Sequence, residues 1–213
     1  MTGTATRAGA VAGVTGPTVF TAAWIVSSLR QTGHPAMDLQ ISGLAAADAR
    51  DPWIMITGFL VLGGCGVAFG AALRDALGGR DLAGPAPRLI QGAGVLTIAA
   101  GLLRRDHMLL IPGSASWHNH AHDVVSAVIY ADLVLAQALL ARRFGRDDTD
   151  PGWRAWRPWL LAGAGVTAGL LAAFAAGTSA PRAGLLQRAV VTVPLAVLAA
   201  VATRLVRTAG TGG

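Results

Sequence analysis

The sequence contains neither lysine nor glutamate: all of its 17 basic residues are arginine and all of its 11 acidic residues are aspartate. Charged residues form only 13% of the chain and hydrophobic residues 53%, whereas about 25% of the residues in a typical soluble domain are charged. This shortage of charge excludes an ordinary soluble domain. The abundance of alanine and glycine, which let helices pack closely in a bilayer, predicts a polytopic membrane protein instead.

Cysteine is nearly absent as well. The single Cys65 excludes an intramolecular disulfide bond, and its place in an apolar run is typical of a small buried hydrophobic residue. The absence of glutamate excludes the HExxH motif of zinc proteases, and the sequence contains no phosphate-binding glycine loop. The net charge of +6 does not indicate a nucleic-acid partner, because the arginines lie at the ends of apolar segments, where they set topology and contact lipid headgroups.

Long apolar runs are the main feature that the sequence does contain. A helix needs about 20 residues to cross the hydrocarbon core of a membrane. Six segments have or approach that length: 10–29, 53–73, 87–103, 121–141, 158–177 and 184–203. We therefore predict that residues 1–213 form one all-α membrane domain, a polytopic bundle of six transmembrane helices, and that the first segment is a retained span rather than a cleaved signal peptide.

The distribution of arginine predicts the orientation of this bundle. Eleven arginines lie on the side of the two predicted termini, and six lie on the opposite side. By the positive-inside rule, both termini are expected to be cytoplasmic, in a multi-pass protein of the cytoplasmic membrane. In this orientation all five histidines, His34 included, lie on the outer side.

Polar chemistry is concentrated in one outer segment, "RRDHMLLIPGSASWHNHAHD", residues 104–123. It holds four of the five histidines of the chain. His118 and His122 are four residues apart, so they share one face of a helix that begins near Trp117. Asp123 suits the positive end of that helix, and Ser126 lies a further turn along the same face.

Four interpretations of this segment stay open. In the first, His118 and His122 are the ligands of a divalent metal such as zinc, and no other cofactor is predicted. In the second, the segment performs acid–base catalysis. The candidate catalytic residues are then His118, His122, Asp123 and Asp106. In the third, Arg104, Arg105, Arg188 and the histidines bind an anionic or lipid headgroup. In the fourth, the segment is a hydrogen-bonded cap without chemistry.

Two further outer segments contribute polar residues. Asp38 and Ser42 are four residues apart in the first outer loop and could face one cavity. Arg188 lies about one turn inside the last predicted span, where an arginine needs a partner, and we expect Asp106 or Asp123 to pair with it. The candidate ligand-binding residues are Asp38, Ser42, Arg104, Arg105, Gln187 and Arg188.

Asp132 lies deep in the fourth predicted span. An ionised aspartate at the bilayer centre costs about 2.5–3.5 kcal/mol, so such a residue marks a functional site by default. Asp132 is therefore a further candidate for catalysis or proton relay, the alternative being a neutral group bonded to another helix. Its spacing from Ser126 and Tyr130 predicts a polar stripe that faces the bundle interior.

Four stretches of the sequence resemble a known family. They are "GVTGPTVFTAAWIVSSLRQTGHPAMDLQISGLA", "LLRRDHMLLIPG", "WHNHAHDVVS" and "GLLQRAVVTV". Over residues 10–207 the chain resembles the bacterial six-span membrane proteins of domain-of-unknown-function family 998, which are abundant in actinobacteria. The third stretch matches the family's His-x-x-x-His-Asp pattern with His118, His122 and Asp123, whereas His107 stands where the family more often has proline. The resemblance implies the six-span fold and supplies no activity.

These observations predict an integral membrane protein of uncharacterised activity with a polar His/Asp/Arg pocket at its outer face. The expected partner is a membrane lipid or another lipophilic small molecule with a polar head. One alternative is a small membrane enzyme, namely a hydrolase, isomerase or cyclase that acts on lipids or polyisoprenoids through acid–base or metal chemistry. Another is a proton-coupled transporter or an assembly partner. Nothing in the sequence indicates an oligomeric state.

Overall fold

The computed structural model describes residues 3–32, 35–78, 84–109, 115–146, 151–177 and 182–209. Within these ranges the protein contains helices and no strands. The helices are α1 (Gly3–Arg30), the 3₁₀ helix η1 (Ile41–Ala45), α2 (Pro52–Ala76), α3 (Ala86–Leu102), α4 (Trp117–Gly145), α5 (Pro151–Arg154), α6 (Arg157–Ala176) and α7 (Ala183–Ala209). The predicted all-α fold is confirmed, and each of the six predicted apolar segments lies on a long helix.

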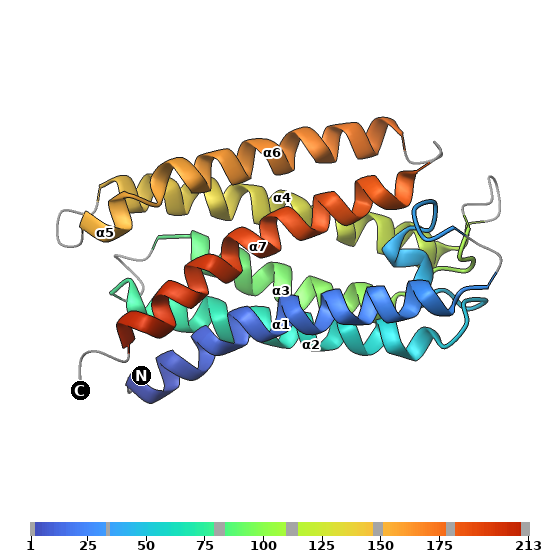
Figure 1. Ribbon diagram of the computed structural model, residues 1–213, viewed down its shortest axis with the longest axis horizontal. Coiled ribbons are helices and arrows are strands. Elements are labelled where there is room, and N and C mark those ends of the chain that lie inside the picture. The colour runs from blue at the N-terminus through green and yellow to red at the C-terminus, as the bar shows by residue number, and fades with distance from the viewer. Residues whose placement is uncertain are drawn as a thin grey trace.

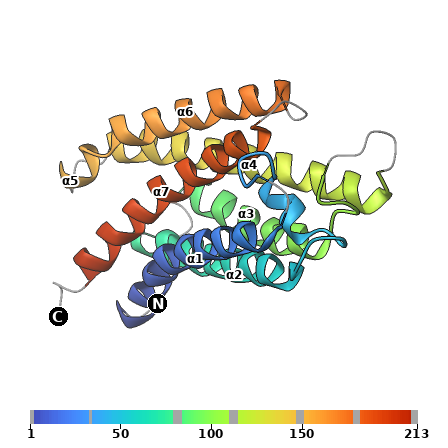
Figure 2. The same ribbon diagram turned by 45° about the vertical axis from the view of Figure 1, so that its right-hand side comes forward.

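The six long helices of the described residues run up and down along one axis and form a closed ring (Figures 1 and 2). Each of α1, α2, α3, α4 and α6 packs against the next long helix along the chain, and α7 packs back against α1. The beginning of α1 and the end of α7 lie at one end of the bundle, and η1 lies at the other, which we call the η1 end (Figure 1). This end corresponds to the side that the sequence predicts to be outer.

Within the described ranges, five helices are long and apolar enough to cross a membrane: α1, α2, α4, α6 together with the turn before it, and α7. The helix α3 has 17 residues and is not among them. The predicted number of six spans is therefore supported for five segments. The protein is a multi-pass membrane protein by the length and composition of its helices.

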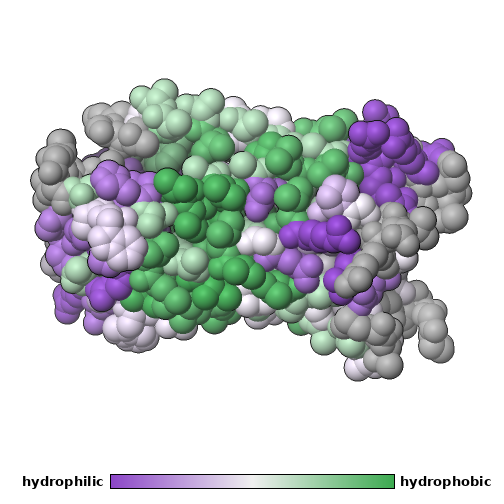
Figure 3. Space-filling model, turned by 180° about the vertical axis from the view of Figure 1, so that it is seen from behind, coloured by the Kyte–Doolittle hydropathy of each residue, from purple (hydrophilic) through white to green (hydrophobic). Residues whose placement is uncertain are grey.

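The surface of the bundle agrees with a membrane environment. On the face shown in Figure 3, apolar residues cover the middle and polar residues gather at both ends. Large apolar side chains within the long helices, such as Val95, Leu135 and Val166, are exposed. In water such a surface would be unfavourable, whereas in a bilayer it is the surface that contacts the acyl chains.

Glycine allows α2 and α3 to approach closely. A Cβ atom on Gly63 would lie 2.5 Å from the carbonyl oxygen of Gly94, and one on Gly94 would lie 2.7 Å from that of Gly63. These contacts are with backbone atoms, which cannot move aside as a flexible side chain can. Small residues at this crossing are the usual means by which membrane helices come into contact.

We predict that Gly63→Ala destabilises the bundle, because its methyl group would overlap the backbone of α3. The expected loss is about 1–3 kcal/mol, as for other overpacked interiors. Gly64→Ala is the matched control, since a Cβ on Gly64 meets nothing within 4 Å. Thermal unfolding in detergent should show a lower Tm for Gly63→Ala only. An equal change in the two variants would contradict this packing.

Candidate functional site

The loop between α1 and α2 folds back into the η1 end of the bundle. Its residues 35–51, which contain η1, are called the η1 loop below. Its apolar residues, Leu39, Ile41, Leu44 and Ala45, are buried in a cluster with Phe20, Met55 and Phe59. The backbone of Gly43 lies directly against the carbonyl oxygen of Met108, and that of Gly184 lies directly against the carbonyl oxygen of Leu39. The loop is therefore a packed part of the interior, which brings its polar residues next to those of α4 and α7.

Arg105 follows α3 and is buried, with 5% of its surface exposed. Its guanidinium donates to Oε1 of Gln40 at 3.1 Å and to Oδ1 of Asp123 at 2.6 Å. Its Nε is buried and has no hydrogen-bond partner among the described residues. Asp123 has 49% of its side chain exposed and also accepts from Nδ2 of Asn119 at 3.3 Å. Arg105 thus joins the η1 loop to α4 while one of its donors stays unused.

The partners of Arg188 differ from the predicted ones. Its depth in the last span predicted an aspartate. It donates to the carbonyl oxygen of Leu39 at 2.7 Å and to Oγ of Ser28 at 2.9 Å, and it lies 5.1 Å from the centre of the Trp24 ring. Among the described residues it forms no ion pair, so the predicted pairing with Asp106 or Asp123 is wrong. Arg105 is the partner of Asp123 because it comes from the adjacent segment after α3.

His122 is buried at the start of α4, with 3% of its surface exposed. Its Nδ1 lies 2.9 Å from the carbonyl oxygens of both Ala100 and Leu103, at the C-terminal end of α3. Because both neighbours only accept, Nδ1 must carry a proton. In the neutral ring Nε2 is then the acceptor, while the Phe59 ring packs edge-on against the imidazole. The helix end thus fixes the tautomer of His122.

Asp106 lies between α3 and α4 and holds the beginning of α4. It accepts from the backbone N–H of Ser116 and from its hydroxyl, both at 2.8 Å. These two hydrogen bonds, first the backbone one and then that of the side chain, lower the pKa of the Asp106 carboxyl. In this structure Asp106 therefore fixes the residue that precedes α4.

A polar cavity of about 360 Å³ lies at the η1 end, between α4, α6, α7 and the η1 loop. Its polar lining residues are Gln40, Ser42, Arg105, His122, Asp123, Ser126, Tyr130 and Gln187, and its apolar ones are Ala127, Leu171, Phe174 and Ala175. Gln187 and Ser42 face each other with long contacts of 3.4 Å in both directions. The cavity thus combines one ion pair with several neutral donors and acceptors.

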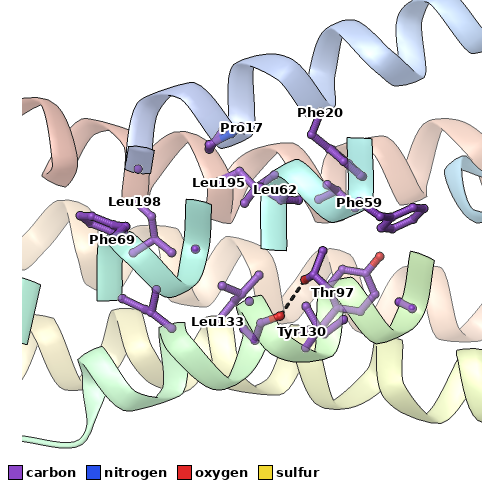
Figure 4. A pocket seen from close by; sticks show the side chains of 18 of the residues that line it. Pro17, Phe20, Phe59, Leu62, Phe69, Thr97, Tyr130, Leu133, Leu195 and Leu198 are labelled. Carbon is purple, nitrogen blue, oxygen red and sulfur yellow. Dashed lines mark hydrogen bonds between the residues drawn. The ribbon is translucent and has the colours of Figure 1, made fainter. Parts of the chain in front are cut away.

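A second cavity, of about 100 Å³, lies inside the ring of helices (Figure 4). It is lined almost entirely by apolar side chains, including those of Phe20, Phe59, Leu133 and Leu195. The hydroxyl of Thr97 in its wall is bonded to the carbonyl oxygen of Ala93 on its own helix and so adds little polarity.

Ser126 and Tyr130 of α4 line both cavities. They are four residues apart and so lie on one face of the helix. Neither hydroxyl forms a hydrogen bond with another described residue. The polar space at the η1 end and the apolar space inside the ring therefore meet at two hydroxyl groups that have no partner among the residues that the structure describes.

The structure brings together only part of the residues that the sequence singles out. Arg105, His122, Asp123, Ser42 and Gln187 line the polar cavity. The others are placed elsewhere: Arg104 donates to the carbonyl oxygens of Ala45 and Ala46, Asp38 accepts from the backbone of Arg182, and His118 is exposed and stacked on Trp117.

Two further interpretations of the sequence concern Asp132 and a metal. Asp132 lies on the other side of α4 from Ser126 and Tyr130, near Gly92 of α3, so the predicted stripe of three residues is wrong. The reason is helical: a step of two residues turns the chain by about 200°. Among the described residues, no three His, Cys or Asp side chains come close enough together to hold a metal ion. His34 lies outside the described residues.

Some residues of the cavity could not be singled out from the sequence. Gln40 lies in a loop without a motif, and Leu171 and Phe174 of α6 look like lipid-facing residues of an apolar helix. Their roles follow only from how the η1 loop and α6 pack beside α4. Tyr130, in contrast, could be singled out from the sequence, because it is the only tyrosine of the chain and lies one helical turn from Ser126.

Comparison with known proteins gives one match. The model of a family described as "Protein of unknown function (DUF998)" matches residues 14–204. No curated protein and no solved structure matches the chain. The match covers every residue that lines the two cavities except Ala12 and Gly13.

We predict that acid weakens the fold through Asp106. Because its pKa is lowered in the folded state, its stabilising effect is complete above the pKa of the unfolded chain and is lost as the pH falls through the folded-state value. Tm should therefore fall as the pH drops below about 4. This fall should be largest in the wild type, smaller in Ser116→Ala and smallest in Asp106→Asn. Identical pH profiles in all three would contradict the assignment.

Proposed function

The chain belongs to the DUF998 family of proteins of unknown function, and we propose that it is a six-span protein of the cytoplasmic membrane that binds one amphiphilic molecule. The polar head of this molecule occupies the cavity at the η1 end, and its apolar chain enters the ring of helices. The observation that carries the proposal is the meeting of a polar and an apolar cavity at Ser126 and Tyr130.

The six-span topology rests on the length of α3 and on the distribution of arginine. The helix α3 has 17 residues. At 1.5 Å per residue it measures about 26 Å, close to the hydrocarbon thickness of about 30 Å. It packs between α2 and α4 over its length (Figure 1). With six spans, both termini lie on the side that carries eleven of the 17 arginines. The positive-inside rule makes that side cytoplasmic and the η1 end outer.

The gradient of polarity favours an amphiphile over a wholly polar or wholly apolar ligand. A polar solute would leave the apolar cavity empty, and a hydrocarbon would desolvate the buried polar groups of the other cavity without giving them partners. A molecule with one polar end satisfies both parts. The two hydrogen bonds between Ser42 and Gln187 are long, at 3.4 Å. Donors of both side chains therefore stay available to such a head.

We predict that a bound amphiphile co-purifies with the protein and that filling the inner cavity expels it. Ala93→Leu places a larger side chain in the wall of that cavity, whereas Ala131→Leu, on an exposed face of α4, is the matched control. Lipid mass spectrometry of the proteins extracted in mild detergent should show a near-stoichiometric molecule in the wild type and the control. Equal amounts in all three proteins would indicate surface lipid and contradict the proposal.

A second candidate function is acid–base catalysis on the bound amphiphile, which His122 favours. Its Nδ1–H is held by two carbonyl oxygens, so Nε2 is free to accept a proton, as the base of a hydrolase requires. In ester hydrolysis Nε2 would take a proton from the attacking water and return it to the leaving alkoxide. The exposed His118 lacks such a support and is the natural control.

We predict for this second candidate that the protein hydrolyses the fluorogenic ester methylumbelliferyl oleate. His122→Gln should lower the turnover by about 100-fold or more, the usual contribution of a general base, and His118→Gln should leave it unchanged. Fluorescence release by the purified protein in phosphatidylcholine nanodiscs measures the rate. Absence of turnover by the wild type, or an equal loss in both variants, would rule out this function.

A further inference from the structure

We propose that the head of the bound molecule is an oxyanion, a carboxylate or a phosphate, carried on a single hydrocarbon chain. This inference rests on the proposed amphiphile binding and deepens it. It follows from the balance of charge at the η1 end, from the unused donors of the polar cavity and from the difference in size between the two cavities.

The buried charge at this end is mainly positive. Arg105 and Arg188 are both buried, with 5% and 9% of their surfaces exposed. Only Arg105 has a carboxylate partner among the described residues, and that partner, Asp123, has 49% of its side chain exposed. Buried charges that lack a counter-charge are costly. The positive charge of both guanidinium groups would favour an anion in the cavity. Arg105 lines the cavity, and Arg188 lies outside its lining.

The unused hydrogen-bond donors lie where such an anion would be placed. The guanidinium of Arg105 lines the polar cavity, whereas its Nε, which has no partner among the described residues, is itself buried and faces away from that space. The hydroxyls of Ser126 and Tyr130, which have no partner in the described structure, stand at the entrance to the apolar cavity. Together with the guanidinium of Arg105, these hydroxyl donors suit a group with several acceptor oxygens at the point where its chain begins.

The sizes of the cavities indicate one chain. The apolar cavity, at about 100 Å³, has less than a third of the 360 Å³ of the polar one. It lies inside a closed ring of helices, and close contacts such as that between Gly63 and Gly94 limit its widening. A molecule with two acyl chains would have to leave one of them outside the ring.

Three probes with the same chain and different heads test this inference: oleate, oleyl phosphate and oleyl alcohol. Binding to the full-length protein in phosphatidylcholine nanodiscs is measured by competition with radiolabelled oleate, at a mildly alkaline pH at which both anions are ionised. At least one anion should bind about tenfold or more tightly than the alcohol, since charge-assisted hydrogen bonds are worth more than neutral ones. The preferred anion distinguishes a carboxylate from a phosphate ligand.

Variants of the ion pair sharpen the test. Arg105→Gln should weaken binding of the anions about tenfold or more and leave the alcohol nearly unchanged. Asp123→Asn should do the opposite and strengthen binding of the anions, because it removes the carboxylate that competes for Arg105. Arg104→Gln is the matched control, since this neighbouring arginine contacts the carbonyl oxygens of the η1 loop and lies outside the cavity lining.

The double variant Arg105→Gln/Asp123→Asn keeps the test valid if the single arginine variant does not fold. It removes both charges, so neither is left buried without its partner, and it should lose the preference for anions. Equal affinities of the wild type for the three probes, or an unchanged preference in the double variant, would overturn this inference and leave the amphiphile proposal standing. Absence of saturable binding of all three probes would instead overturn the proposed function.

Discussion

Two buried guanidinium groups hold the η1 end of this protein together. A guanidinium has five N–H donors and cannot lose its charge, so inside a membrane protein it must find acceptors in the chain itself. Arg188 takes the carbonyl oxygen of Leu39 and the hydroxyl of Ser28, while Arg105 takes Gln40 and Asp123. Both therefore bind consecutive residues of the same loop. This loop closes the end of the helix ring and at the same time becomes a wall of the polar cavity.

The helices could be predicted from the sequence because hydrophobic length is a strong signal in a membrane protein. The segment 53–73 lies on α2 (Pro52–Ala76) and the segment 184–203 on α7 (Ala183–Ala209), and the other four segments agree equally well. The helices α1, α2, α4 and α7 extend beyond the predicted segments, whereas α3 and α6 match theirs to within one residue at each end. The η1 loop could not be predicted, because its helix is short and its burial depends on partners that are distant in the sequence. Such partners include Gly184, which lies against Leu39.

The sequence shows which polar residues belong to the outer segments. It was harder to predict which of them come into contact in the folded protein. Of the residues predicted in the segment after α3, Arg105, His122 and Asp123 line the polar cavity. Depth alone suggested that Arg188 would need an acid, but the carbonyl oxygen of Leu39 and the hydroxyl of Ser28 serve it as acceptors. Spacing also misplaced Asp132, whereas Leu133 and Gln137, which continue the face of Ser126 and Tyr130, are buried. His118 and His122 share a face as expected, yet only the latter reaches the interior, because α3 ends beside it.

The arrangement as a whole is a ring of helices with an apolar interior and a polar end joined at two hydroxyl groups. Photo-crosslinking tests most directly whether an amphiphile enters it, with oleyl alcohol that carries a diazirine near the end of its chain. The account predicts that mass spectrometry finds the label on residues that line the inner cavity, such as Leu62 and Leu195. Label only on the outward-facing residues of the bundle, such as Val95 and Leu135, would contradict it.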